Sequence, residues 1–104
     1  MTISAHEAHI DISDSTFFLK GHLDFDSVIV LLSQADASIA KMQDCRIDMT
    51  EVTYSNSAGV AFLLHLLRTA AKYKIPLSIS SIPQNLQDLI KLSGVDELIA
   101  VSTQ

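Results

Sequence analysis

Two apolar periodicities alternate along this chain, and their alternation limits the folds that it can adopt. In some segments every second residue is apolar, as in Cys45, Ile47 and Met49, which predicts β-strands. In others the apolar residues recur every three to four positions, as in Val28 and Leu31, which predicts helices. The expected order begins with strands over 9–13 and 16–20 and a helix whose apolar spacing runs from Ser27 to Met42, with Asp24, Asp26 or Ser27 available as its cap. A strand over 45–50, a helix over 57–72 and a strand over 77–79 follow. A helix from Pro83 to Gly94 and a short last strand over 98–101 complete the order.

The connections between these segments predict the topology. The polar pair Asp14 and Ser15 joins the first two strands by a tight turn, which predicts a hairpin and one antiparallel strand at an edge of the sheet. Each later strand follows a helix, an arrangement typical of parallel sheets. The sequence therefore predicts an α/β fold with a mixed, mostly parallel sheet of four to five strands flanked by helices. With 104 residues, the whole chain, 1–104, is expected to form one domain.

The charge and the cysteine content exclude several classes of protein. The net charge is −5 and no cluster of Lys or Arg is present, so the basic surface that binds nucleic acid or anionic lipid is lacking. The single cysteine, Cys45, cannot form an internal disulfide and is expected in the core, and residues 1–13 do not resemble a secretion signal. The longest apolar runs, 28–32 and 58–64, are far shorter than the roughly 20 residues that span a bilayer. We expect a cytoplasmic protein that does not insert into a membrane.

Catalytic and metal sites are not expected. His6, His9, His22 and His65 show no HExxH or paired-ligand spacing, and a second cysteine for zinc is absent. His65 follows Ser57 on the same predicted helix by about 12 Å, too far to activate its hydroxyl. The three glycines are too far apart to form a phosphate-binding loop. We therefore expect no enzymatic activity, no metal and no cofactor.

The helix predicted after Ser57 has an unusually narrow polar face. Its polar side chains form one stripe at helical spacing, and toward the N-terminus this stripe reaches only small residues. From its C-terminal end the stripe consists of Lys72, Thr69, Arg68, His65, Ala61 and Ala58. An exposed face that begins with small apolar residues can lie close against a partner protein. The other interpretation is that alanine favours the helix and that this face contacts only water.

Ser57 is expected where the first backbone N–H groups of this helix point outward. A phosphate on its hydroxyl would be stabilised by these donors and by the helix dipole, so phosphorylation of Ser57 is physically plausible. The simpler interpretation is that Ser55, Asn56 or Ser57 caps the helix, which contributes about 1 kcal/mol. Spacing alone favours the capping role.

Three segments together resemble the STAS family. They are residues 21–24 (Gly-His-Leu-Asp) before the first helix, residues 47–52 (Ile-Asp-Met-Thr-Glu-Val) at a strand end, and residues 55–61 (Ser-Asn-Ser-Ala-Gly-Val-Ala) at the start of the second helix. The likeness covers nearly the whole chain, and the last two motifs in tandem are fairly specific. The resemblance implies a single STAS domain with a regulatory or scaffolding role and no catalysis.

Two branches of this family have a hydroxyl residue at the position of Ser57. In anti-sigma factor antagonists a partner kinase phosphorylates it, and the dephosphorylated domain captures that kinase. In the cytoplasmic STAS subunit of the Mla-type phospholipid ABC transporter, the same helix region docks on the ATPase subunit and supports its activity. Asn56 stands where an aspartate usually precedes the hydroxyl residue, which argues against a switch that needs this carboxylate. Residues 61–67 look closer to the transporter subunit.

The resemblance therefore implies a subunit that docks on an ABC transporter ATPase and, through it, on a membrane permease, in a complex that maintains outer-membrane lipid asymmetry. Ser57, Ala58, Ala61 and His65 are expected to face outward and to contact the ATPase, with the protein peripheral to the inner membrane through its complex. The alternative is an anti-sigma factor antagonist that binds an anti-sigma factor kinase and is switched by phosphorylation of Ser57. A third interpretation is a sensory STAS module with a small ligand, for which the sequence offers no recognisable pocket.

Overall fold

The computed structural model describes residues 7–100, which form a sheet and a layer of helices. In chain order the elements are β1 (Ala8–Ser13), β2 (Thr16–Leu23), α1 (Phe25–Ile39), β3 (Cys45–Ser55), α2 (Ser57–Lys72), β4 (Leu77–Ser80), α3 (Gln84–Leu92) and α4 (Asp96–Ala100). The predicted order, a hairpin followed by alternating helices and strands, is confirmed through α3. In the described part of the chain, no helix has the length and apolar character needed to cross a membrane.

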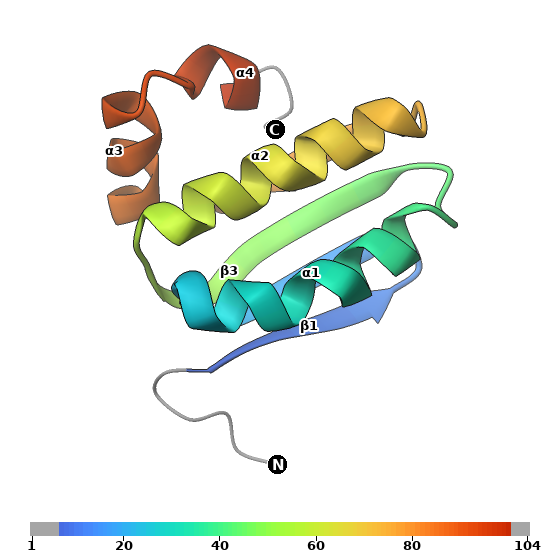
Figure 1. Cartoon of the computed structure of the whole chain (residues 1–104), viewed down its shortest axis with the longest axis horizontal. Helices are drawn as coiled ribbons and strands as arrows, with labels where there is room; N and C mark the ends of the chain where they lie inside the picture. Colours follow the sequence, from blue (N-terminus) through green and yellow to red (C-terminus); the bar gives the residue numbers. More distant parts are fainter. Residues whose placement is uncertain (1–6, 101–104) are drawn as a thin grey trace.

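The sheet has the strand order β1-β2-β3-β4. β1 pairs antiparallel with β2, and Ser13 lies opposite Thr16 across the turn, where Asp14 has a φ of 54°. β2, β3 and β4 are parallel, so the predicted mixed, mostly parallel sheet is confirmed. Two right-handed crossovers that step in the same direction place both connecting helices on one face of the sheet. α1 and α2 accordingly lie side by side over that face and run in the same direction (Figure 1).

The core fills the space between the sheet and the two helices. Alternate side chains of β2 are fully buried, and those between them are only half-buried because they belong to the opposite face. The largest fully buried side chains are Phe17, Leu19 and Leu23 of β2, Ile47 and Met49 of β3, Ile39 of α1, Phe62, Leu63 and Leu66 of α2, Ile79 of β4, Leu86 of α3 and Ile99 of α4. Cys45 is also buried, as predicted, and burial raises the pKa of its thiol to about 11.

Of the three residues that the sequence offers as the cap of the first helix, the structure uses Asp24, so α1 begins at Phe25. Asp24 is its N-cap: its Oδ1 accepts a hydrogen bond of 2.9 Å from the backbone N–H of Ser27, and Ser27 Oγ accepts one of 3.0 Å from the backbone N–H of Asp24. This reciprocal capping box satisfies two donors that the helix cannot pair internally. The bond from the Ser27 N–H also holds the pKa of Asp24 below its usual value. The helix ends at Ile39 rather than at Met42.

The third strand continues beyond Thr50, where the prediction ended it. Its pairing with β2 is irregular there, because Phe18 lies opposite Asp48 whereas Lys20 lies opposite Glu51. An extra residue in one strand shifts the side-chain alternation by one position. A second irregularity follows, because Gly21 lies opposite Val52 whereas His22 lies opposite Tyr54. Val52 and Ser55 are therefore both buried although they are three residues apart, and the two-residue pattern in the sequence stops before the strand does.

The predicted last strand over 98–101 is wrong for the part that the structure describes. Residues Asp96–Ala100 form the short helix α4, and Val101 lies outside the described residues. Asp96 and Glu97 occupy the first turn of α4, where carboxylates interact favourably with the helix dipole. Ile99 is 2% exposed, so its side chain anchors this turn in the core.

Gly21 should tolerate a side chain far less well than Gly94, although both have a positive φ, of 91° and 74°. A Cβ at Gly21 would collide with the backbone carbonyl oxygen of Glu7, whereas a Cβ at Gly94 meets nothing within 4 Å. We expect Gly94→Ala to lower the free energy of unfolding by about 1 kcal/mol, the cost of a left-handed conformation, and Gly21→Ala by about 3 kcal/mol. Urea unfolding of both variants measures the difference, and equal losses would show that the collision is relieved without cost.

Candidate functional site

The short connection between β3 and α2 places the N-terminus of α2 at the carboxyl end of the sheet. β3 ends at Ser55 and α2 begins at Ser57, with Asn56 between them. The backbone N–H of Asn56 donates to the carbonyl of Leu23 (3.1 Å), and the side-chain Oδ1 of Asn56 accepts from the backbone N–H of Ala58 (2.8 Å). Of the three capping candidates in the sequence, Asn56 is therefore the cap.

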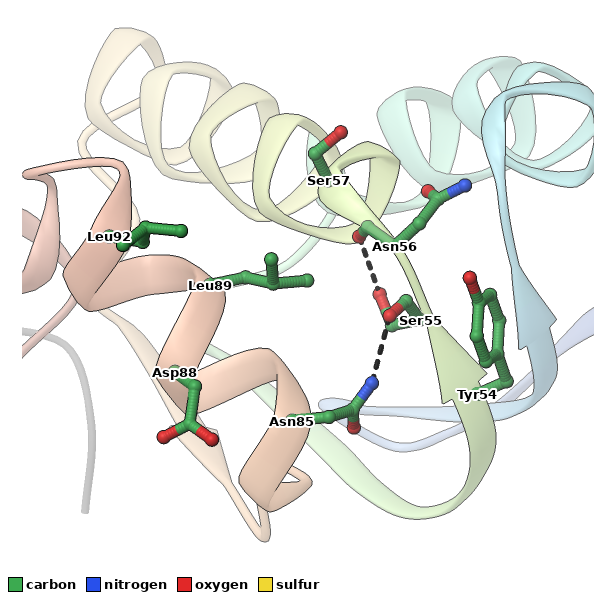
Figure 2. Close-up of a pocket in the computed structure, with 8 residues that line it drawn as sticks. All are labelled: Tyr54, Ser55, Asn56, Ser57, Asn85, Asp88, Leu89 and Leu92. Atoms are coloured by element: carbon green, nitrogen blue, oxygen red, sulfur yellow. Dashed lines mark hydrogen bonds between the residues drawn. The ribbon is translucent and has the colours of Figure 1, made fainter.

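Ser55 and Gly59 pack directly against each other beneath this turn. A Cβ at Gly59 would collide with Ser55 Oγ and lie 3.3 Å from Cδ1 of Leu86. Ser55 is 2% exposed; its hydroxyl donates to the carbonyl of Asn56 (3.0 Å), and its own carbonyl accepts from Nδ2 of Asn85 (2.9 Å), as Figure 2 shows. These contacts join β3, α2 and α3 at one point and make Ser55 a structural residue.

Ser57 and Ala61 are exposed, as predicted, but Ala58 is not. Ala58 is 0% exposed and belongs to the core. Successive helix residues are rotated by about 100°, so a face that shows Ser57 and Ala61 turns Ala58 toward the sheet. The exposed face continues with Arg68 and Lys72, and the prediction that Ala58 lies on it is wrong.

His65 is half-exposed but has a partner within the chain. Its Nε2 lies 2.8 Å and 3.0 Å from the two carboxylate oxygens of Asp36 on α1. Thr69 Oγ1 donates to Asp36 Oδ1 (3.3 Å) and to the carbonyl of His65 (3.0 Å). Asp36 was not predicted as a site residue. Its contact with His65 fastens α2 to α1 at a place where both side chains are about 40% exposed.

Three apolar side chains on α1 are exposed beside this region. Phe25 is 59%, Ile29 66% and Val30 72% exposed. The signal was present in the sequence: residues 28–32 are all apolar, whereas the buried helix face takes up only Val28, Leu31 and, in part, Leu32. The exposed patch was not predicted, because this run of apolar residues was considered only as a possible membrane span.

The patch on α1 is level with the N-terminus of α2. The two helices run in the same direction (Figure 1), and Asp36 pairs with His65. Ile29 precedes Asp36 by seven residues, about two helical turns, and Ala58 precedes His65 by the same number. Ser57 and Ala61 lie next to Ala58 on the exposed side of α2. Ile29 therefore lies beside Ser57 and Ala61 on one surface, which we call the helix-start surface (Phe25, Ile29, Ser57 and Ala61).

An open pocket of about 600 Å³ lies on the other side of Ser57, between the N-terminus of α2 and α3 (Figure 2). It is lined by Tyr54, Ser55, Asn56, Ser57, Asn85, Asp88, Leu89 and Leu92. His65 is not among them, so no imidazole accompanies the Ser57 hydroxyl in this pocket. Among residues 7–100, no group of three or more His, Cys, Asp or Glu side chains is placed to hold a metal ion.

Comparison with known proteins agrees with this architecture. The family model described as "Mlab, STAS domain" matches residues 6–100, and the search of curated proteins returned no match. Several solved structures are similar in fold, among them the following three. The anti-sigma factor antagonist SpoIIAA in its unphosphorylated form has a TM-score of 0.65 at 14% identity, covering 93% of this chain and 85% of its own. The phosphorylated form of the Bacillus cell fate determinant SpoIIAA has a TM-score of 0.64 at 13% identity, covering 93% of this chain and 88% of its own. An anti-sigma factor antagonist from Mycobacterium paratuberculosis has a TM-score of 0.68 at 18% identity, covering 88% of this chain and 80% of its own.

The capping role of Asn56 can be tested directly. Asn56→Ala removes the acceptor for the Ala58 N–H and should lower the free energy of unfolding by about 1 kcal/mol. Asn56→Asp keeps an acceptor and adds a charge that the helix dipole favours, so it should be at least as stable as the wild type. Urea unfolding at neutral pH measures both; an Asn56→Ala variant of wild-type stability would contradict the cap.

Proposed function

Because the chain belongs to the STAS family described as Mlab, we propose that it is a non-enzymatic subunit of an Mla-type phospholipid-transport ABC complex. In this role it docks on the ATPase subunit and supports ATP hydrolysis, and it contacts the membrane permease through that subunit. The proposal places the protein in the cytoplasm, peripheral to the inner membrane, as part of a system that maintains outer-membrane lipid asymmetry.

The observation that carries the proposal is the helix-start surface. Phe25 and Ile29 are more than half exposed, and next to them Ser57 and Ala61 are too small to keep a partner away. Contiguous exposed apolar side chains on a small protein typically mark an interaction site. Burial of one such side chain in an interface contributes about 1.5–3 kcal/mol, so this surface can supply a large part of a specific binding energy.

A docking subunit of this kind can control activity without touching the substrate. If the chain binds the assembled, active arrangement of the ATPase more tightly than the inactive one, its binding raises the population of the active arrangement by mass action. The two helices that form the surface are held together by the Asp36–His65 contact of 2.8 Å. The partner therefore meets a preformed surface, which reduces the entropy cost of binding.

Variants of the helix-start surface test the proposal. We expect Ile29→Ser to weaken binding to the ATPase subunit about 10-fold, because it removes most of one apolar contact. Ser57→Asp should weaken binding at least as much, because a buried, unpaired charge costs several kcal/mol. Biolayer interferometry with the purified ATPase gives the affinities, and ATP hydrolysis by the assembled transporter gives the functional effect.

Tyr73→Ser is a matched control, since Tyr73 is 47% exposed but lies at the opposite end of α2. It should bind and support hydrolysis like the wild type. All of these residues are exposed, so thermal unfolding should show stabilities within about 0.5 kcal/mol of the wild type. Wild-type affinity of both Ile29→Ser and Ser57→Asp would place the ATPase elsewhere on the chain.

The second candidate is an anti-sigma factor antagonist, which the exposed hydroxyl of Ser57 at a helix N-terminus favours. Two observations weigh against it. Asn56 occupies the position of the usual aspartate. Among the residues that the structure describes, no Lys, Arg or His lines the pocket beside Ser57 to stabilise a phosphate.

Purification of the tagged protein from its native cells in mild detergent separates the two candidates. For the transporter subunit we expect an ABC ATPase and a permease to co-purify, and the intact mass to show an unmodified chain. A phosphate on Ser57 together with a co-purifying soluble kinase would establish the anti-sigma factor antagonist instead, and Ser57→Ala would then abolish the modification.

A further inference from the structure

The pocket between α2 and α3 has one apolar and one polar side. Leu89 and Leu92 of α3 form the apolar side, and the short segment 55–57 forms the polar side (Figure 2). Leu92 is 86% exposed, more than any other large apolar side chain of the described residues. α3, which carries this apolar side, is firmly held, because Leu86 is 0% exposed and packs near Gly59 and because Asn85 donates to the carbonyl of Ser55. The exposure of Leu92 therefore belongs to an anchored helix.

Of the described residues that line the pocket, one, Asp88, is charged. One of its carboxylate oxygens accepts a hydrogen bond from Nε2 of Gln84 (3.1 Å). Within residues 7–100 no Lys, Arg or His lies at ion-pair distance from Asp88, and none lines the pocket. Lys91 follows Asp88 on the same helix but does not line the pocket. Asp88 therefore gives the lining a negative charge, the same sign as the net charge of −5 of the whole chain.

From this charge and apolar surface we propose that the pocket receives a segment of the partner protein that presents an apolar side chain to Leu89 and Leu92 and a Lys or Arg to Asp88. The inference rests on the proposed function and specifies it: the ATPase subunit contacts the chain on both sides of Ser57, through the helix-start surface and through this pocket. The apolar contact supplies affinity, and the cation fixes the orientation and accelerates association.

Charge decides among the possible occupants. An anionic ligand would face Asp88 without any cation in the lining. A second copy of this chain carries the same net negative charge and would be repelled at low salt. A cationic segment is the occupant that the pocket attracts.

Affinities for the ATPase subunit measure the contribution of the pocket. Asp88→Asn should weaken binding about 3-fold and reduce its dependence on salt, and Asp88→Lys should weaken it about 10-fold or more, because like charges then meet. Leu92→Ser should weaken binding about 5-fold through the lost apolar contact. Asp44→Asn is the matched control: it removes the same charge from an exposed residue that precedes β3, at the opposite end of the sheet, and should bind like the wild type.

A cross-link identifies the segment. With p-benzoylphenylalanine at position 92, irradiation of the assembled complex should join the chain to an ATPase peptide that carries Lys or Arg within a few residues of an apolar side chain. Reversal of that cation to Glu in the ATPase should restore binding to the Asp88→Lys variant.

The outcomes distinguish a wrong pocket inference from a wrong proposed function. If Ile29→Ser weakens binding but all Asp88 and Leu92 variants bind like the wild type, the pocket inference is wrong and the proposed function stands. If the wild-type chain does not bind the ATPase, the proposed function fails and the inference with it. A cross-link from position 92 only to a second copy of the chain would also overturn the inference, as would one to an ATPase peptide without a cation.

Discussion

The close packing of Ser55 against Gly59 is the contact on which the site depends. Because Gly59 has no side chain, the first turn of α2 lies directly on the last residue of β3. The carbonyl of Ser55 then remains available to Asn85, which fixes α3 beside the same turn. Two surfaces lie beside Ser57, the helix-start surface and the pocket at α3. Both depend on this close contact between the end of β3 and the start of α2.

The helices that carry these surfaces are joined by polar as well as apolar contacts. Asp36, His65 and Thr69 form a hydrogen-bonded group between α1 and α2, above the apolar side chains that both helices bury against the sheet. Hydrogen bonds depend on direction more strongly than apolar packing does, so this group favours the one rotation and register of the two helices at which its bonds can form. The alignment of Ile29 with Ser57 and Ala61 depends on that register.

Local patterns predicted most of the fold but only part of the site. The spacing of apolar residues within each segment was enough to predict the hairpin, the helix over 57–72 and the parallel strands. The end of β3 could not be found in this way, because the irregular pairing at Glu51 shifts the alternation and is determined by β2. Ala58 was placed outward for a similar reason: an alanine fits either face of a helix, and only the packing of the sheet decides. Asp36 and Asp88 acquire their roles from residues far away in the chain, which no local pattern shows.

The strand directions give this domain two unequal ends. The helix-start surface and the pocket lie where β2 and β3 finish, whereas the β1–β2 turn at Asp14 and the loop that contains Asp44 lie where β3 starts. Asp14 and Asp44 are exposed, and neither lies near Ser57. The second end is therefore the natural place to attach a fluorophore, an affinity tag or a surface linker, since a bulky group there leaves both proposed binding surfaces accessible.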